Sequence, residues 1–154
     1  MNIPWLELNN ALPAPETAQK KGSSLAGLVA AGGGLSVDRL QEAYKQGMFP
    51  WFSQGQPVLW WSPDPRMVLK TSEFKLHRSL RKTLQQFIDC DACEIKIDSD
   101  FSAVIEHCAR TSRKGQPGTW IVEEMISAYE ALHTAGFTHS VETWRNGQLI
   151  GGLY

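Results

Sequence analysis

Residues 139–154 read HSVETWRNGQLIGGLY, two runs of alternating apolar and polar residues on either side of Asn146-Gly147. Asn-Gly between alternating runs is the strongest short-range sequence signal for a β-hairpin, because both residues accept the left-handed backbone of a tight turn. We therefore predict a hairpin with strands over 139–145 and 148–154. The second strand would run to Tyr154, and we expect more sheet to follow it.

Upstream of the hairpin, helical and strand-like patterns alternate. Apolar residues recur every three or four positions within 36–47, 77–88, 99–108 and 123–135, which indicates helices that bury one face. Ser36 can cap the first of these helices, Asp98 or Ser99 can cap the third, and Gly136 can end the fourth. Short apolar runs at 58–61, 67–69 and 93–98 are typical of strands. The pattern predicts a mixed fold of the α+β or α/β class.

Composition limits the size and the class of the protein. The 154 residues are 42% hydrophobic with a formal net charge of −1, which suits one core of ordinary size and excludes a disordered or fibrous chain. The balanced charge provides no overall attraction to DNA or an anionic membrane, so RNA contact requires a local basic patch. Without a signal-peptide pattern or an apolar run of about 18 residues, we expect a cytoplasmic protein with reduced cysteines and no membrane partner.

The N-terminal residues differ in composition from the rest. Residues 1–34 are rich in Pro, Ala and Gly, which favours extended backbone and a flexible joint at Gly32-Gly33-Gly34. We expect an extended or flexible arm over 1–34, a small N-terminal lobe over 35–62 and a larger unit over 63–154.

Tryptophans are concentrated in segments that read as loops. Trp51, Trp60 and Trp61 stand beside Pro, Ser or another tryptophan, and Trp120 lies two positions after Gly118. None of the four is on a helical stripe. Indole rings in loops can stack on bases or line a ligand pocket. The ordinary alternative is that each ring fills the core, and the sequence leaves both explanations open.

The predicted 77–88 helix has two unlike faces. Leu80, Leu84, Phe87 and Ile88 share one side, so we expect the helix to be apolar inside and basic outside. The basic flank consists of Arg78, Arg81 and Lys82. It is uninterrupted by acidic residues, so phosphate would be a suitable partner, although solvated helix faces commonly carry such charges.

The cysteines and histidines form no complete catalytic or metal motif. Cys90 and Cys93 have the spacing of half a zinc site or of a redox pair, but no second pair completes four ligands. No strand-to-helix junction places them as in thioredoxin either. The four histidines are scattered over separate predicted elements, so none can be matched to a nucleophile by spacing. We therefore predict no metal and assign no function to the cysteine pair.

Three stretches resemble signature blocks of the leucyl/phenylalanyl-tRNA-protein transferase family. They are AYKQGMFPWF (43–52), LWWSPDPR (59–66) and GTWI (118–121). Shorter blocks resemble the same family in the same order, namely EALH (130–133), HSVE (139–142) and GGLY (151–154). The resemblance extends from about Leu25 to Tyr154, and tryptophan-rich runs of this length are highly specific.

This resemblance implies a fold and a reaction. The fold would be a small N-terminal lobe packed on an acetyltransferase-like α/β domain, of which residues 63–154 would be the N-terminal portion. The reaction would transfer Leu, Phe or Met from aminoacyl-tRNA to the N-terminal Arg or Lys of an acceptor protein, without metal or organic cofactor. The product would enter the N-degron pathway of protein degradation.

The resemblance also implies roles for individual residues. By position, Trp51, Trp120 and Leu153 would bind the aminoacyl-adenosine end of the tRNA. Arg78 and Lys82 match basic positions that contact the acceptor stem, and Arg81 would act beside them.

The chain departs from the family pattern at one point. Family members continue past Gly-Gly-x-Tyr into a Gly-Glu-Ser-Met-Phe-Ser block and an Asp-x-Gln motif associated with the chemistry, and neither is present here. We therefore assign no catalytic residue within these residues and expect them to be incomplete for catalysis. The alternative is a non-catalytic RNA-binding module that uses the aromatic loops and the basic helix. A coenzyme A-dependent acetyltransferase would need a Gly-rich pyrophosphate loop before a helix, which we do not find.

Overall fold

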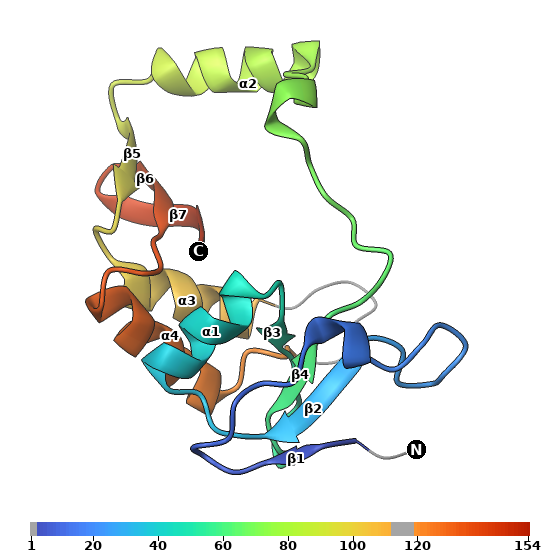
Figure 1. The fold of residues 1–154 in the computed structure, drawn as a ribbon. Helices are drawn as coiled ribbons and strands as arrows, with labels where there is room; N and C mark the ends of the chain where they lie inside the picture. The colour runs from blue at the N-terminus through green and yellow to red at the C-terminus, as the bar shows by residue number, and fades with distance from the viewer. Residues whose placement is uncertain (1–2, 112–118) are drawn as a thin grey trace.

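The computed structural model describes residues 3–111 and 119–154 (Figure 1). Its elements are β1 (Trp5–Leu6), a 3-10 turn (Pro15–Thr17), β2 (Leu28–Gly32), α1 (Val37–Lys45), β3 (Phe49–Pro50), β4 (Leu59–Trp61), a second 3-10 turn (Thr71–Glu73), α2 (Arg78–Ile88), β5 (Cys93–Ile97), α3 (Phe101–Arg110), α4 (Glu123–Thr134), β6 (Val141–Arg145) and β7 (Gln148–Leu153). The strands form two separate sheets with helices packed beside them, so the fold is of the α+β class.

The N-terminal sheet has the strand order β1-β2-β4-β3, with β1 parallel to β2 and the other pairs antiparallel. All of β2 is buried. Residues 28–32 were expected within an extended or flexible arm, and the structure corrects this: they form a central strand. The reason is that small and apolar residues, from Leu28 to Ala31, can be covered on both faces of a sheet. Gly32 also belongs to this strand, and its amide donates a hydrogen bond to the Val58 carbonyl at 2.7 Å.

Helix α1 binds the first residues of the chain through a buried charge. The predicted N-cap is confirmed, since the Ser36 hydroxyl accepts the Arg39 amide at 3.2 Å. The Arg39 side chain is only 6% exposed and forms an ion pair with Glu42 at 3.0 Å. Its guanidinium also donates to the carbonyls of Leu8 and Asn10. These bonds satisfy a buried cation and fasten the N-terminal segment to the helix.

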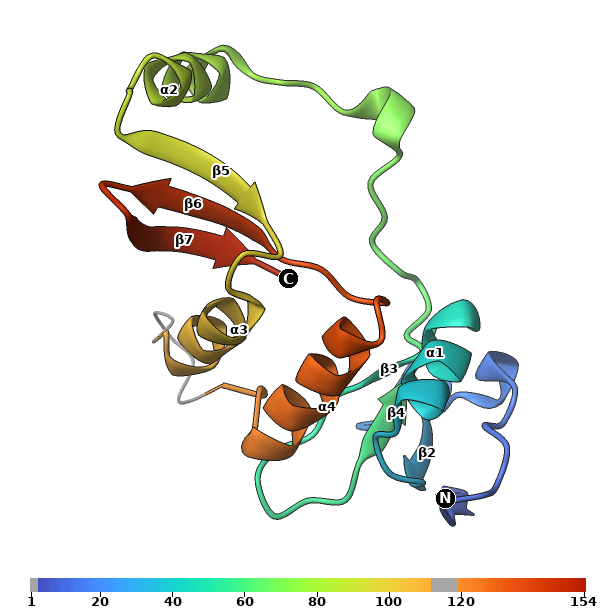
Figure 2. The ribbon, with the colours of Figure 1, turned by 90° about the vertical axis from the view of Figure 1, so that its left-hand side faces the viewer.

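Helix α4 lies between α1 and α3 (Figure 2). Met125, Tyr129 and Leu132 are buried on it, as the sequence pattern predicts. These side chains belong to one hydrophobic core that includes buried residues of both α1 and α3. Gly136 follows the helix with φ of 80°, which confirms the predicted stop signal.

The C-terminal sheet is antiparallel, with the order β5-β6-β7. The predicted hairpin is confirmed, because Asn146 and Gly147 both have positive φ, 51° and 73°, between β6 and β7. Helix α3 packs against β7 on one face of this sheet. On the other face Ile95 and Ile97 are 55% and 68% exposed.

Helix α3 begins one or two residues later than predicted. Its N-cap is Asp100, whose carboxylate accepts the Ala103 amide at 3.1 Å, rather than Asp98 or Ser99. Asp98 instead adopts a left-handed backbone with φ of 53° and accepts the Ser140 amide at 2.8 Å. Asp98 therefore joins the end of β5 to the start of β6, and the helix starts after that connection.

Glu142 of β6 joins the hairpin to the start of α3. Its carboxylate is fully buried and accepts the amides of Ser99 and Asp100, the Ser140 hydroxyl and the Trp144 indole at 2.7–2.9 Å. Burial alone would raise the pKa of Glu142, but these hydrogen bonds together outweigh it and hold the pKa below its ordinary value. The carboxylate is therefore charged at neutral pH and faces the positive end of a helix.

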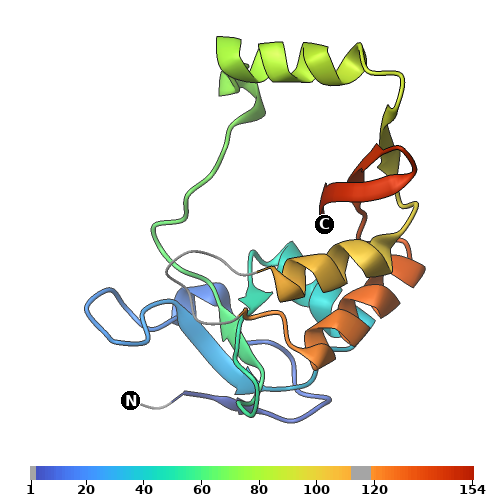
Figure 3. The same cartoon turned by 180° about the vertical axis from the view of Figure 1, so that it is seen from behind.

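Helix α2 stands apart from the rest of the chain (Figures 1 and 3). Its main contact is with β5. We predicted that the apolar face of this helix is buried, and this is wrong, since Leu80, Leu84 and Ile88 are 51%, 44% and 65% exposed. The predicted strand at 67–69 is also absent, and Met67 is 98% exposed. Both predictions fail for the same physical reason: no other element in the described ranges covers these apolar side chains.

We expect Gly152→Ala to destabilise the protein, because an added Cβ would lie 2.8 Å from Cγ2 of Val104 on α3. Overpacking of this kind costs about 1–3 kcal/mol of unfolding free energy. Gly151→Ala is the matched control, since its Cβ would lie 3.9 Å from the nearest atom, Cβ of Thr143. Urea unfolding should show a lower midpoint for Gly152→Ala only. Equal midpoints for the two variants would contradict the close approach of α3 to β7.

We expect Glu142→Gln to lower the unfolding free energy by about 1–3 kcal/mol at pH 7 and by less at pH 4. The pKa of Glu142 is lowered from 4.5 in the folded protein, so the stabilising effect is present above that value and is lost as the pH falls through the folded pKa. Urea unfolding at both pH values measures the difference. Glu16→Gln, at an exposed position, is the control, and a loss at Glu142 that is independent of pH would contradict the charged network.

Candidate functional site

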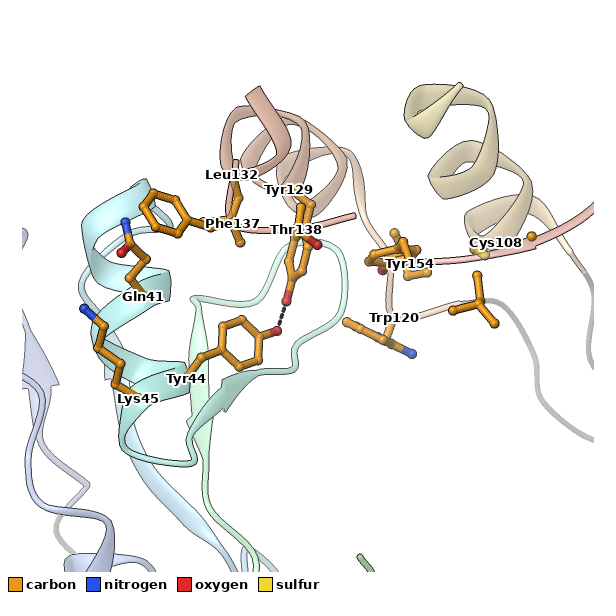
Figure 4. A pocket seen from close by; sticks show the side chains of 13 residues that line it. Gln41, Tyr44, Lys45, Cys108, Trp120, Tyr129, Leu132, Phe137, Thr138 and Tyr154 are labelled. Carbon is orange, nitrogen blue, oxygen red and sulfur yellow. Dashed lines mark hydrogen bonds between the residues drawn. The ribbon is translucent and has the colours of Figure 1, made fainter. Parts of the chain in front are cut away.

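An apolar pocket of about 830 Å³ lies where α1, α4 and the end of β7 meet (Figure 4). Its volume is in the range of pockets that hold small molecules or cofactors. Aromatic rings dominate its lining, so we call it the aromatic pocket. The large side chains that line it are Tyr44, Trp120, Ile121, Tyr129, Leu132, Phe137, Leu153 and Tyr154.

Two phenol groups from different helices meet in the aromatic pocket. The hydroxyl of Tyr44 on α1 is hydrogen-bonded to that of Tyr129 on α4 (Figure 4). Burial of these hydroxyls raises the pKa of both, although the hydrogen bond to Tyr129 and the charge of Arg66 partly offset the rise at Tyr44. Both phenols therefore stay protonated at neutral pH. They can orient a ligand by hydrogen bonding but are poor bases.

Tyr154 and Trp120 form another part of the lining (Figure 4). The Tyr154 ring lies edge-on to Phe101 and to Tyr129, with centroid separations of 5.8 Å and 5.6 Å. Trp120 is half-buried between the core and the pocket. Rings held in this way present flat apolar surfaces, which suit stacking against a base or an aromatic side chain.

The structure brings together two of the three residues expected to bind aminoacyl-adenosine. Trp120 and Leu153 both line the aromatic pocket, and Leu153 is 62% exposed. Trp51 does not belong to the lining. It follows β3, is 51% exposed, and lies 5.8 Å from the Trp61 ring, whose Nε1 donates to the Trp51 carbonyl at 2.7 Å.

The other two tryptophans lie in β4 and outside the aromatic pocket. Trp60 is fully buried in β4, and its Nε1 donates to the Gly32 carbonyl at 2.9 Å. It is therefore part of the core, with its polar edge satisfied by the neighbouring strand. Trp61, also in β4, is half-buried and supports Trp51.

The basic flank lies on α2, away from the aromatic pocket (Figure 1). Arg78, Arg81 and Lys82 are all exposed. None of them makes an ion pair within the ranges 3–111 and 119–154. Their charge is therefore available to an external anion. Two further basic residues, Arg113 and Lys114, fall outside the described residues, as does Gly118 of the GTWI block.

The sequence patterns missed three tyrosines of the pocket. Tyr44 and Tyr129 read as members of apolar helical stripes, and Tyr154 read as the end of a strand. A phenol on the buried face of a helix does carry a signal, because its hydroxyl needs a hydrogen-bond partner there. That signal does not identify the partner, which comes from a helix 85 positions away in the chain.

The pocket supplies binding groups rather than acid-base groups. Among the described residues, Lys45 is the one charged side chain in its lining, and none of them contributes a carboxylate or a histidine. Across the described part of the chain, no group of three or more His, Cys, Asp or Glu side chains could hold a metal ion. No helix within the same residues is both long and apolar enough to cross a membrane.

The chain matches two family models that together cover most of its length. Residues 33–64 match the leucyl/phenylalanyl-tRNA protein transferase N-terminal domain, and residues 68–154 match leucyl/phenylalanyl-tRNA protein transferase. Neither match supports the alternative of a non-catalytic RNA-binding module.

Several bacterial proteins named leucyl/phenylalanyl-tRNA–protein transferase are similar to the chain. That of Polaromonas sp. is 59% identical over 152 residues, and that of Leptothrix cholodnii 57% identical over 155 residues. In both cases 99% of this chain and 60% of the relative are covered, so the chain spans about 60% of the length of these relatives. The protein of Paraburkholderia xenovorans is 51% identical, with 99% of this chain and 62% of the relative covered. By these matches, the chain belongs to the leucyl/phenylalanyl-tRNA protein transferase family.

Proposed function

We propose that the protein containing this chain transfers Leu, Phe or Met from aminoacyl-tRNA to the N-terminal Arg or Lys of acceptor proteins. Membership of the family supports the transfer of an aminoacyl group from tRNA to protein. The structural observation that carries the proposal is the position of Trp120 and Leu153, which line the same apolar pocket although 33 positions separate them in the sequence.

The aromatic pocket suits the charged 3′ end of a tRNA. An apolar aminoacyl side chain would lie against Leu132, Phe137 and Leu153, and the adenine would stack on Trp120 or Tyr154. Stacking contributes about 1–3 kcal/mol per base and does not depend on sequence. An apolar pocket also distinguishes side chains by about 1–3 kcal/mol per methylene, which favours large apolar residues such as Leu, Phe and Met over small ones.

Binding and orientation are the contributions of this pocket to the reaction. An aminoacyl ester is already an activated acyl donor, and an α-amino group with a pKa of about 8 is partly neutral at pH 7. Attack by that amine on the ester carbonyl forms the peptide bond and releases the 3′ hydroxyl of the tRNA. Holding the two reactants in contact can by itself account for a large part of the rate. The neutral phenols of Tyr44 and Tyr129 are placed to help orient the ester.

The tRNA acceptor stem is the proposed partner of the basic flank. Unpaired Arg and Lys side chains bind phosphates without reading the sequence, which suits an enzyme that accepts several tRNAs. We place Trp51 at the aminoacyl-adenosine site on the resemblance alone, since it lies outside the pocket lining.

We also propose that the protein acts in the cytoplasmic N-degron pathway, as the resemblance to the family implies.

We further propose a domain boundary near residue 62. The boundary is supported by the end of β4 at Trp61 and by the extended segment that leads from it to α2 (Figure 1). Because β2 lies inside the N-terminal sheet, residues 3–34 belong with the 35–62 lobe.

A transfer assay with a matched pair of variants tests the function. The whole protein that contains this chain is mixed with labelled Leu-tRNA or Phe-tRNA and a peptide that begins with Arg. We expect label on the peptide, and none on the same peptide with an acetylated N-terminus. Leu153→Trp should lower kcat/KM for Phe by about fivefold to a hundredfold, because overfilling the pocket costs about 1–3 kcal/mol of transition-state binding.

Ile150→Trp is the control for this assay, because Ile150 is 56% exposed on the same strand but is absent from the pocket lining. tRNA binding without any transfer would sink the proposed activity in favour of an RNA-binding module. Transfer that is equally fast in Leu153→Trp and in the unaltered protein would leave the activity standing but contradict the assignment of the pocket.

Neutralising the basic flank should weaken tRNA binding in a salt-dependent way. For the triple variant Arg78→Gln, Arg81→Gln and Lys82→Gln, the slope of log Kd against log salt should fall in magnitude by about 2–3, near one per lost phosphate contact. Filter binding at several salt concentrations measures the slope. The double variant Lys20→Gln and Lys21→Gln, at exposed positions on the N-terminal lobe, is the control. An unchanged slope in the triple variant would exclude the flank as a phosphate contact.

A further inference from the structure

Cys90 and Cys93 meet at the turn between α2 and β5. Their Sγ atoms lie 2.8 Å apart, and both side chains are half-buried. The Cys93 amide donates to the Cys90 carbonyl at 2.9 Å, which closes a four-residue turn. The two thiols are therefore in contact and can be reached by a small reagent.

The backbone of this turn suits a disulfide bond. A turn closed by such a hydrogen bond has its first and fourth Cα atoms within about 7 Å, which overlaps the range of about 4.4–6.8 Å found across disulfides. The turn is also held from outside, because the Asn146 amide at the tip of the hairpin donates to the Ala92 carbonyl at 2.9 Å. Oxidation therefore requires little movement of the backbone.

The two thiols are not equivalent. The Cys93 thiol donates to the Cys90 sulfur. This bond, the Ala92 amide and the charge of Arg145 hold the pKa of Cys90 below its ordinary value, and the same contact raises the pKa of Cys93. Cys90 is thus the better nucleophile, and Cys93 is placed to resolve an intermediate on it.

We propose that Cys90 and Cys93 form a redox-active dithiol that reacts reversibly with small-molecule disulfides. The Cys90 thiolate attacks one sulfur of the disulfide R–S–S–R, forms a mixed disulfide and releases the first R–S⁻. Cys93 then loses its proton to solvent and attacks the Cys90 sulfur, which forms the Cys90–Cys93 bond and releases the second R–S⁻. The protein gives up two electrons and two protons, and R–S–S–R is reduced to two R–SH.

Two further observations fit this assignment. Within the residues that the structure describes, no third His, Cys, Asp or Glu joins the pair in a metal-binding group, so a dithiol is favoured over a metal site. The turn also connects the basic helix α2 to β5, which is the strand that α2 mainly contacts. Closing the disulfide ring would stiffen that connection. The proposal does not depend on the function proposed above.

Glutathione disulfide tests the dithiol directly. The reduced protein is incubated with it, free thiols are alkylated, and intact and peptide masses are recorded. The unaltered protein and Cys108→Ser should each form the Cys90–Cys93 bond, without retained glutathione, and should recover both thiols in excess reduced glutathione. Cys93→Ser should retain one glutathione on Cys90, and Cys90→Ser should react with glutathione disulfide several-fold more slowly than Cys93→Ser.

Circular dichroism confirms that each variant is folded before its reaction is compared. Stable glutathione adducts on both cysteines of the unaltered protein would overturn the proposal. So would equal reaction rates for Cys90→Ser and Cys93→Ser, or retention of zinc by the purified protein with both thiols protected from oxidation.

Discussion

The buried face of α4 is the contact on which the rest of the structure depends. Met125, Tyr129 and Leu132 pack on one side against α1 of the N-terminal lobe and on the other against α3, which covers the C-terminal sheet. The two sheets do not share a strand, so this helix joins them through side-chain packing. The aromatic pocket is a consequence of that arrangement, because it lies where α1 and α4 meet the end of β7. Apolar burial thus holds the fold and shapes the site with the same residues.

Two buried charged side chains hold chain segments that apolar packing alone does not fix. Arg39 binds the N-terminal segment to α1, and Glu142 binds the hairpin to the first turn of α3. Each charge is costly to bury alone, and each is surrounded by hydrogen-bonding partners that offset the cost. Both carbonyl partners of Arg39 and both amide partners of Glu142 belong to irregular backbone or a helix terminus, where main-chain groups lack regular partners. The charges therefore position segments that regular secondary structure cannot hold.

The site and the basic flank occupy different parts of the molecule. The aromatic pocket offers rings, an apolar surface and neutral phenols, which suit the binding of an aminoacyl-adenosine that we propose. The flank on α2 offers unpaired cations, which suit the phosphates of a helical stem. The cysteine pair lies at the C-terminal end of α2, where the proposed disulfide bond would stiffen the connection of that helix to β5.

Local chemistry in the sequence was enough for the hairpin at Asn146-Gly147, the cap at Ser36 and the stop at Gly136, because each depends on neighbours a few positions away. The signature blocks likewise identified the family. The binding of aminoacyl-adenosine that they imply for Trp51, Trp120 and Leu153 stays a prediction, and of these residues Trp120 and Leu153 line the aromatic pocket. Tertiary structure alone decided which tryptophan serves which purpose: Trp60 is sealed in the core, Trp120 lines the pocket and Trp51 lies outside it. It also placed β2 at the centre of a sheet, left the apolar face of α2 exposed and brought the Tyr44 hydroxyl to Tyr129. The physical reason is that backbone preference is set by adjacent residues, whereas burial and side-chain partnership are set by whatever distant segment packs alongside.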